Sequence, residues 1–199
     1  MKFDLLTGVF TLVPLALIDK RPGVTVAQVL RNWGWVFLGN LGGALTVAFI
    51  MSFVLTYGYS IDGGALAAKV SSIGESRTLG YKEHGLDGWL TIFMRGMLCN
   101  WMVSMGVVGA MISTSATGKI AAMWMPVMLF FFMGFEHSIV NMFLFPFSMI
   151  MGGGFTVSEY LIWNELPTAL GNLVGGLVFV ALPLYYTHVK TSPARAISK

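Results

Sequence analysis

The sequence predicts an all-α integral membrane protein, a helical bundle formed by an inverted repeat with two broken helices. Three observations lead to this prediction: the low charge, the long uncharged stretches and an internal repeat. Of the 199 residues, 56% are hydrophobic and only 11% are charged, and the mean hydropathy is +0.75. A soluble domain has about 25% charged and about 45–50% apolar residues. The composition therefore excludes an ordinary soluble enzyme, and it also excludes disorder, which requires low hydrophobicity.

Charged residues divide the chain into uncharged stretches whose lengths predict the helices. A helix needs about 20 apolar residues to cross a bilayer. Three stretches meet this requirement, at about 33–57, 89–114 and 166–187. The stretch 120–150 is too long for one helix and is interrupted at 134–137, which predicts a broken helix. The stretch 5–18 is too short to cross and predicts a half helix.

The charges between these stretches predict the orientation. Segments 19–31 and 115–119 and the C-terminal tail are basic, whereas connections 58–88 and 151–165 are net acidic. The positive-inside rule places the basic segments in the cytoplasm. The net charge of +3 is too small to indicate nucleic-acid binding.

An internal repeat appears when the sequence is shifted by 132 residues. Residues 3–45 then align with 135–177 without a gap, with 11 identities in 43 pairs. An odd number of crossings separates the two copies, so they are inverted, as in transporters and channels whose sites lie at helix breaks. We interpret 1–199 as one transmembrane transporter domain. Its parts are an incomplete repeat 1–60, a second repeat 88–188 and a cytoplasmic tail 189–199.

The second copy has a full span and a half helix before its break, and the first copy has no counterpart of either. The symmetry therefore predicts that the first helix and the first half of the second helix are missing, as in an N-terminally truncated chain.

The residues at the breaks are the candidate functional groups. His137 lies at mid-depth in an apolar stretch, where an ionisable side chain indicates a functional site; the alternative is a neutral histidine bonded to a backbone carbonyl. Glu136 and its repeat partner Asp4 are expected to accept hydrogen bonds from free amides at the start of each half helix, and the alternative is proton transfer. Half-helix N-termini that point inward favour an anion.

Three further polar or aromatic residues are candidates. Thr7 could offer its hydroxyl to the same substrate, or bond to its own helix. Phe130 could form a hydrophobic constriction, or face lipid. Asn100 could contact the pore, or bridge two helices.

The sequence does not suggest an enzyme, a metal or a cofactor. His137 and Ser138 are adjacent and cannot form the usual nucleophile–base pair, and no nucleophile elbow is present. His84, His137 and His188 are far apart in the sequence, and Cys99 is the single cysteine.

Three motifs resemble those of the formate/nitrite transporter family: Gly-Phe-Glu-His-Ser-Ile-Val-Asn-Met at 134–142, Arg-Gly-Met-Leu-Cys-Asn-Trp at 95–101 and Gly-Asn-Leu-Val-Gly-Gly at 171–176. The resemblance covers nearly the whole chain. It implies an aquaporin-like fold of six helices, two of them broken, and a homopentamer with one pore in each protomer.

The resemblance also implies roles for individual residues. His137 would be the central pore histidine, with Thr7 opposite it. Leu5, Leu6 and Thr7 would form the loop at the break of the second helix. Phe130 would be a constriction aromatic and Asn100 the pore-proximal asparagine of helix four. Lys82 is the nearest candidate for the family's anion-attracting lysine.

The function implied is a channel or transporter for a small monovalent weak-acid anion, such as formate, nitrite or hydrosulfide, whose passage is either passive or coupled to a proton. The protein would lie in the plasma (inner) membrane with a cytoplasmic C-terminus. One alternative is a non-functional truncated fragment of such a transporter. A second is a water or glycerol channel, although the Asn-Pro-Ala boxes of such channels are absent.

Overall fold

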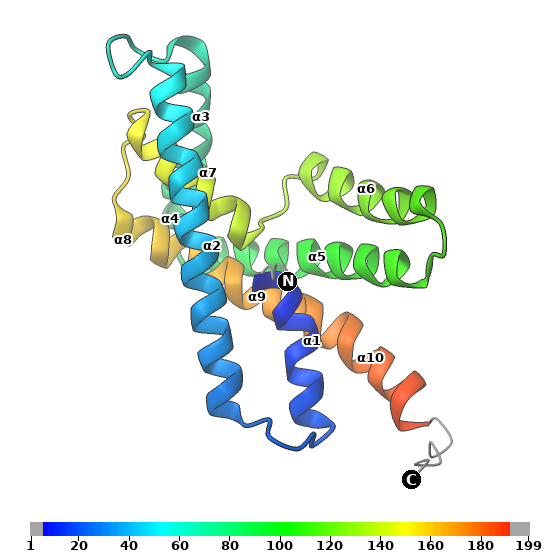
Figure 1. The fold of residues 1–199 in the computed structure, drawn as a ribbon. Coiled ribbons are helices and arrows are strands. Elements are labelled where there is room, and N and C mark those ends of the chain that lie inside the picture. Colours follow the sequence, from blue (N-terminus) through cyan, green and yellow to red (C-terminus); the bar gives the residue numbers. More distant parts are fainter. Residues whose placement is uncertain (1–5, 192–199) are drawn as a thin grey trace.

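The computed structural model describes residues 6–191, and these residues form helices joined by short connections (Figure 1). The first seven helices are α1 (Leu6–Ile18), α2 (Val26–Leu55), α3 (Gly64–Ser76), α4 (Leu79–Glu83), α5 (Gly85–Ile112), α6 (Ala116–Phe132) and α7 (Ser138–Ile150). One further helix runs continuously over Val157–His188. Within it, α8 (Val157–Tyr160), α9 (Leu166–Gly176) and α10 (Leu182–Leu184) alternate with the π-helical turns Leu161–Glu165, Leu177–Ala181 and Tyr185–Lys190.

The three predicted spans correspond to α2, α5 and the helix Val157–His188, which are long and apolar enough to cross a membrane. Each begins several residues earlier than the charge pattern predicts. For α2 the reason is a capping box, in which Thr25 accepts from Gln28 N and the Gln28 side chain accepts from Thr25 N. Arg31 therefore lies inside the helix instead of preceding it.

The predicted break at 134–137 is present between α6 and α7, and Gly134 explains the end of α6. Its φ of +64° lies in the left-handed region that glycine tolerates. Phe135 N donates to Phe130 O at 3.0 Å and Gly134 N donates to Phe131 O at 3.1 Å. This pair of bonds is a Schellman motif, which satisfies carbonyls at the end of a helix.

The predicted half helix at 5–18 is α1. Asp4 and Leu5 lie outside the described residues, as do the tail residues 192–199.

The connection 58–88 contains a helix that the sequence analysis did not predict. Helix α3 is too short to span, and it packs against α7. Its residues Ala67, Val70 and Gly74 are buried. A Cβ at Gly74 would collide with Ser148, so the small residue permits this close packing.

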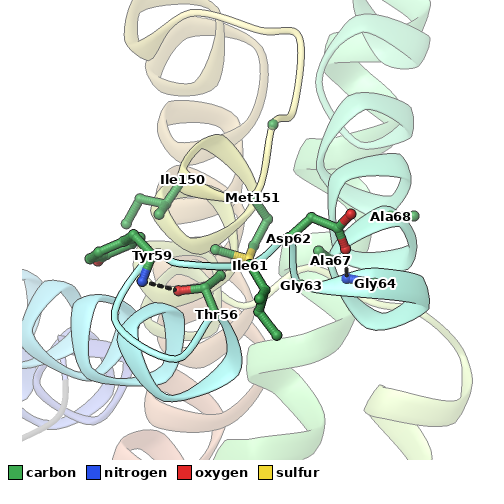
Figure 2. Close-up of a pocket in the computed structure, with 11 residues that line it drawn as sticks. Thr56, Tyr59, Ile61, Asp62, Gly63, Gly64, Ala67, Ala68, Ile150 and Met151 are labelled. Carbon is green, nitrogen blue, oxygen red and sulfur yellow. Dashed lines mark hydrogen bonds between the residues drawn. The ribbon is translucent and has the colours of Figure 1, made fainter.

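A cavity of about 630 Å³ lies between the α2–α3 connection and the end of α7 (Figure 2). A second cavity extends from Thr7 and Asn100 to residues near the C-terminal ends of three helices, which are Leu15 of α1, Met111 of α5 and Leu184 of α10. The three basic segments that were predicted to be cytoplasmic follow α1, α5 and α10, and the C-terminal ends of these helices line the same cavity.

Candidate functional site

The site is centred on His137, the residue that caps α7. Its side chain is 7% exposed, and its Nδ1 accepts a hydrogen bond from Val140 N at 3.4 Å. An acceptor Nδ1 places the proton of the neutral imidazole on Nε2. The local sequence therefore orients the ring with its N–H directed away from α7.

Thr7 lies opposite this N–H. Its Oγ1 is 3.4 Å from His137 Nε2, and both side chains are buried. Thr7 is the second residue of α1, and His137 immediately precedes α7. The two half helices of the inverted repeat therefore begin at the same place in the molecule, as the family resemblance implies.

Phe130 packs against the same histidine. The two rings are stacked with their centroids 5.6 Å apart, and Phe130 is 3% exposed. Phe130 also stacks on Phe131, whose side chain is exposed. Phe130 therefore contacts the histidine and is itself buried.

Asn100 connects three segments. Its Nδ2 donates to Thr7 O at 3.2 Å and to Asn172 O at 2.6 Å. Its Oδ1 has no hydrogen-bond partner among the described residues. Asn100 and Thr7 line a narrow cavity of about 60 Å³ together with Thr11 and Ser104, whose hydroxyls are 2.9 Å apart. The asparagine thus bridges helices and also faces this cavity.

Asn172 holds the break in place, and the sequence analysis did not single it out. Its Oδ1 accepts from Ser138 N at 3.0 Å, and its Nδ2 donates to Gly96 O at 2.8 Å and to Glu136 O at 3.0 Å. The available signal was the repeat itself, because Asn172 matches Asn40. Asn40 makes the corresponding bond in the first copy, where its Oδ1 accepts from Leu6 N at 3.4 Å.

Glu136 accepts hydrogen bonds, but the donors differ from the helix amides that were predicted. It is fully buried, and its Oε2 accepts from Asn141 Nδ2 at 3.0 Å and from Asn164 Nδ2 at 3.3 Å. Arg77 Nε lies 3.7 Å from its Oε1. The predicted bonds to free helix amides are absent among the described residues, because Ser138 N and Val140 N are bonded to Asn172 and His137.

Lys82 lies apart from this network. Its Nζ is 2.8 Å from Glu159 Oε1, and about half of its side chain is exposed. Arg77, which the sequence analysis did not choose, is the cation beside Glu136. Next to it, Tyr81 accepts a hydrogen bond from Arg95, and burial together with the charge of Glu136 raises the pKa of Tyr81.

Leu6 is buried in an apolar cluster with Val9, Phe10 and Met142. Asp4 and Leu5, the other predicted residues of this break, are outside the described range.

Apolar spanning helices and two half helices that meet at a buried histidine define a membrane channel or transporter of the broken-helix class. The family model described as Formate/nitrite transporter matches residues 1–186, and the chain belongs to this family. It is a multi-pass membrane protein, and the predicted all-α, aquaporin-like fold class is confirmed.

Individual relatives agree with this assignment. The chain is 37% identical to a probable formate transporter of Methanothermobacter thermautotrophicus, over 94% of the chain and 69% of the relative. It is 31% identical to a formate channel of Bacillus thuringiensis, over 94% of the chain and 66% of the relative. The chain thus spans about two thirds of the length of these relatives.

Two solved structures share the fold. One is an FNT family ion channel, with a TM-score of 0.75 and 28% identity over 92% of this chain and 68% of that one. The other is a pentameric formate channel with formate bound, with a TM-score of 0.68 and 26% identity over 91% of this chain and 82% of that one.

Proposed function

We propose that the chain conducts small monovalent weak-acid anions, with formate as the first candidate and nitrite and hydrosulfide as members of the same chemical class. The observation that carries this proposal is the contact between Thr7 and His137 at the junction of two inverted half helices. The relatives named as formate transporters and channels support the choice of formate.

The junction provides two sources of positive potential for an anion. The N-termini of α1 and α7 present the positive ends of their helix dipoles. The His137 Nε2–H adds a donor at the same point. An anion that stops here can accept hydrogen bonds from Thr7 and His137 without a fixed positive charge to trap it.

A proton would lower the barrier beyond this point. Burying an anion costs several kcal/mol or more, whereas a neutral acid crosses an apolar passage at much lower cost. The stacked ring of Phe130 makes the surroundings of His137 apolar. We infer that His137 first takes up a proton from water to become the imidazolium, and then passes that proton to the anion and returns to its neutral form.

The neighbouring residues take supporting roles in this proposal. Phe130 forms a constriction, Asn100 fixes the backbone at Thr7, and Glu136 holds the break. Lys82 attracts anions at an entrance. Leu5, Leu6 and Asp4 belong to the break of the first copy.

We also propose a homopentamer, the plasma (inner) membrane as location and a cytoplasmic C-terminus. A structural relative described as a pentameric formate channel supports the assembly. The basic connections that follow α1 and α5 support the orientation, because residues near the C-terminal ends of α1, α5 and α10 line one cavity. The repeat boundaries 1–60 and 88–188 belong to this proposal.

Formate and nitrite flux into proteoliposomes tests the proposal. Replacing His137 by Ala should lower both fluxes at least about tenfold, because a hydrogen bond to a charged group contributes about 1.5–3 kcal/mol. His84→Ala is the matched control, since His84 is exposed at the start of α5. Unchanged flux in His137→Ala would exclude the histidine as the pore group.

A further inference from the structure

Glu165 is a second buried carboxyl group, and the proposed mechanism does not use it. It is 3% exposed and ends the π-helical turn Leu161–Glu165. Its Oε1 accepts from the Ser138 hydroxyl, and its Oε2 accepts from Tyr160 Oη at 2.8 Å. Ser138 directly follows the pore histidine, so Glu165 is connected to the break through one side chain.

The partners of Glu165 differ in kind from those of Glu136. Glu136 accepts from the Nδ2 atoms of Asn141 and Asn164, which are donors only, and Arg77 lies close by. The partners of Glu165 are two hydroxyl groups, which can each donate or accept. The hydroxyls can therefore rotate and accommodate either protonation state.

The basic side chains near Glu165 interact with other residues. Among residues 6–191 the ion pairs are Arg21–Asp19, Arg77–Glu136 and Lys82–Glu159, so none includes Glu165. Arg95 donates to Tyr81. The elements packed against the turn Leu161–Glu165 are α4, α5, α7, α8 and α9. Their titratable residues, with those of the adjoining caps, are Tyr81, Lys82, Glu83, His84, Asp87, Arg95, Cys99, Glu136, His137, Glu159 and Tyr160.

We propose that Glu165 is a proton-binding site separate from His137, and that its protonation state is communicated to the break through Ser138. The anionic form accepts from both hydroxyls. When a proton from water binds to one carboxylate oxygen, that oxygen becomes a donor, and Ser138 or Tyr160 must turn to accept from it.

Turning the Ser138 hydroxyl changes the side-chain hydrogen bond of the first residue of α7. The backbone N–H of this residue donates to Asn172. Proton binding would then alter how firmly His137 is positioned. This consequence rests on the proposed function, whereas the proton site itself does not.

Infrared difference spectroscopy of the reconstituted 199-residue chain tests the site without any transport measurement. The wild-type protein should show a carboxylic-acid band that appears and disappears with pH. Glu165→Gln should lose this band, and Glu83→Gln, a change of an exposed glutamate on α4, should retain it. An unchanged band in Glu165→Gln would overturn the proposal.

Ser138→Ala keeps the proposal testable if Glu165→Gln does not fold. The carboxylate loses one donor, which shifts the midpoint of the band to higher pH by about one pH unit. Tyr160→Phe should produce a shift in the same direction. Unchanged midpoints in both variants would show that these hydroxyls do not sense the proton.

Flux measurements separate the two proposals. If the wild-type chain conducts formate, Glu165→Gln should flatten the dependence of flux on pH while leaving flux measurable. A flux profile identical to that of the wild type would disprove the link to the break. Absence of flux in the wild-type chain would contradict the proposed function, and the infrared band would still decide the assignment of Glu165.

Discussion

The two copies of the Leu-Gly-Asn-Leu motif, at 38–41 in α2 and at 170–173 in α9, share a sequence but have different surroundings. In α9, a Cβ at Gly171 would collide with Phe93 O, and one at Gly175 would collide with Met97 O. In α2, a Cβ at Gly39 or Gly43 would meet no described atom within 4 Å. The glycines of α9 allow the close approach of α5, and those of α2 have no such neighbour among the described residues.

The asparagines of the two motifs behave alike. Asn172 accepts from Ser138 N, and Asn40 accepts from Leu6 N. Each asparagine thus holds the first amide of the half helix in its own copy. The hydrogen bond from the asparagine to the half helix is therefore present in both copies. The close contact of the glycines with a neighbouring helix is present only in the second copy, where that helix is α5.

The largest expected effect comes from removing Asn172. Asn172→Ala leaves two buried carbonyls, of Gly96 and Glu136, and the amide of Ser138 without their partner. Each such group costs about 1–3 kcal/mol, so the free energy of unfolding should fall by about 3 kcal/mol or more. Asn40→Ala should cost less, because Asn40 is only partly buried. Equal losses, measured by denaturant unfolding in detergent, would contradict this difference.

The glycines should show the next largest contrast. Gly171→Ala and Gly175→Ala place a methyl group against the α5 backbone, and overpacking of this kind costs about 1–3 kcal/mol. Gly39→Ala and Gly43→Ala meet open space and gain helix propensity of about 1 kcal/mol, so thermal stability should stay equal or rise. A loss at Gly39 matching that at Gly171 would contradict the open surroundings of Gly39.

The smallest change in stability is expected at Thr7, which matches Ile139 in the second copy. Thr7→Val removes the hydroxyl opposite His137 and keeps the branched shape of the side chain. Unfolding free energy should fall by only about 1 kcal/mol, because a single hydrogen bond contributes about that much. Formate flux should fall about tenfold through the lost hydrogen bond. Thr46→Val, at an exposed position on α2, is the control, and equal flux in the two variants would argue against the role of Thr7.

Much of the fold could be predicted from the order of residues. The uncharged stretches indicated α2, α5 and the last span, because apolar length decides what can cross a bilayer. The break predicted at 134–137 is present after α6, because a glycine in the left-handed region ends a helix through local backbone hydrogen bonds. The 132-residue repeat pointed to the junction of α1 and α7.

Only the tertiary structure decided which side chains meet. It places Arg77 beside Glu136 and Lys82 beside Glu159, and it brings Glu165 to Ser138. It also adds α3 inside the segment 58–88, which the charge pattern predicts as a connection. The physical reason is that periodicity determines which residues share a helix face, whereas partners on different helices depend on how those helices cross and rotate.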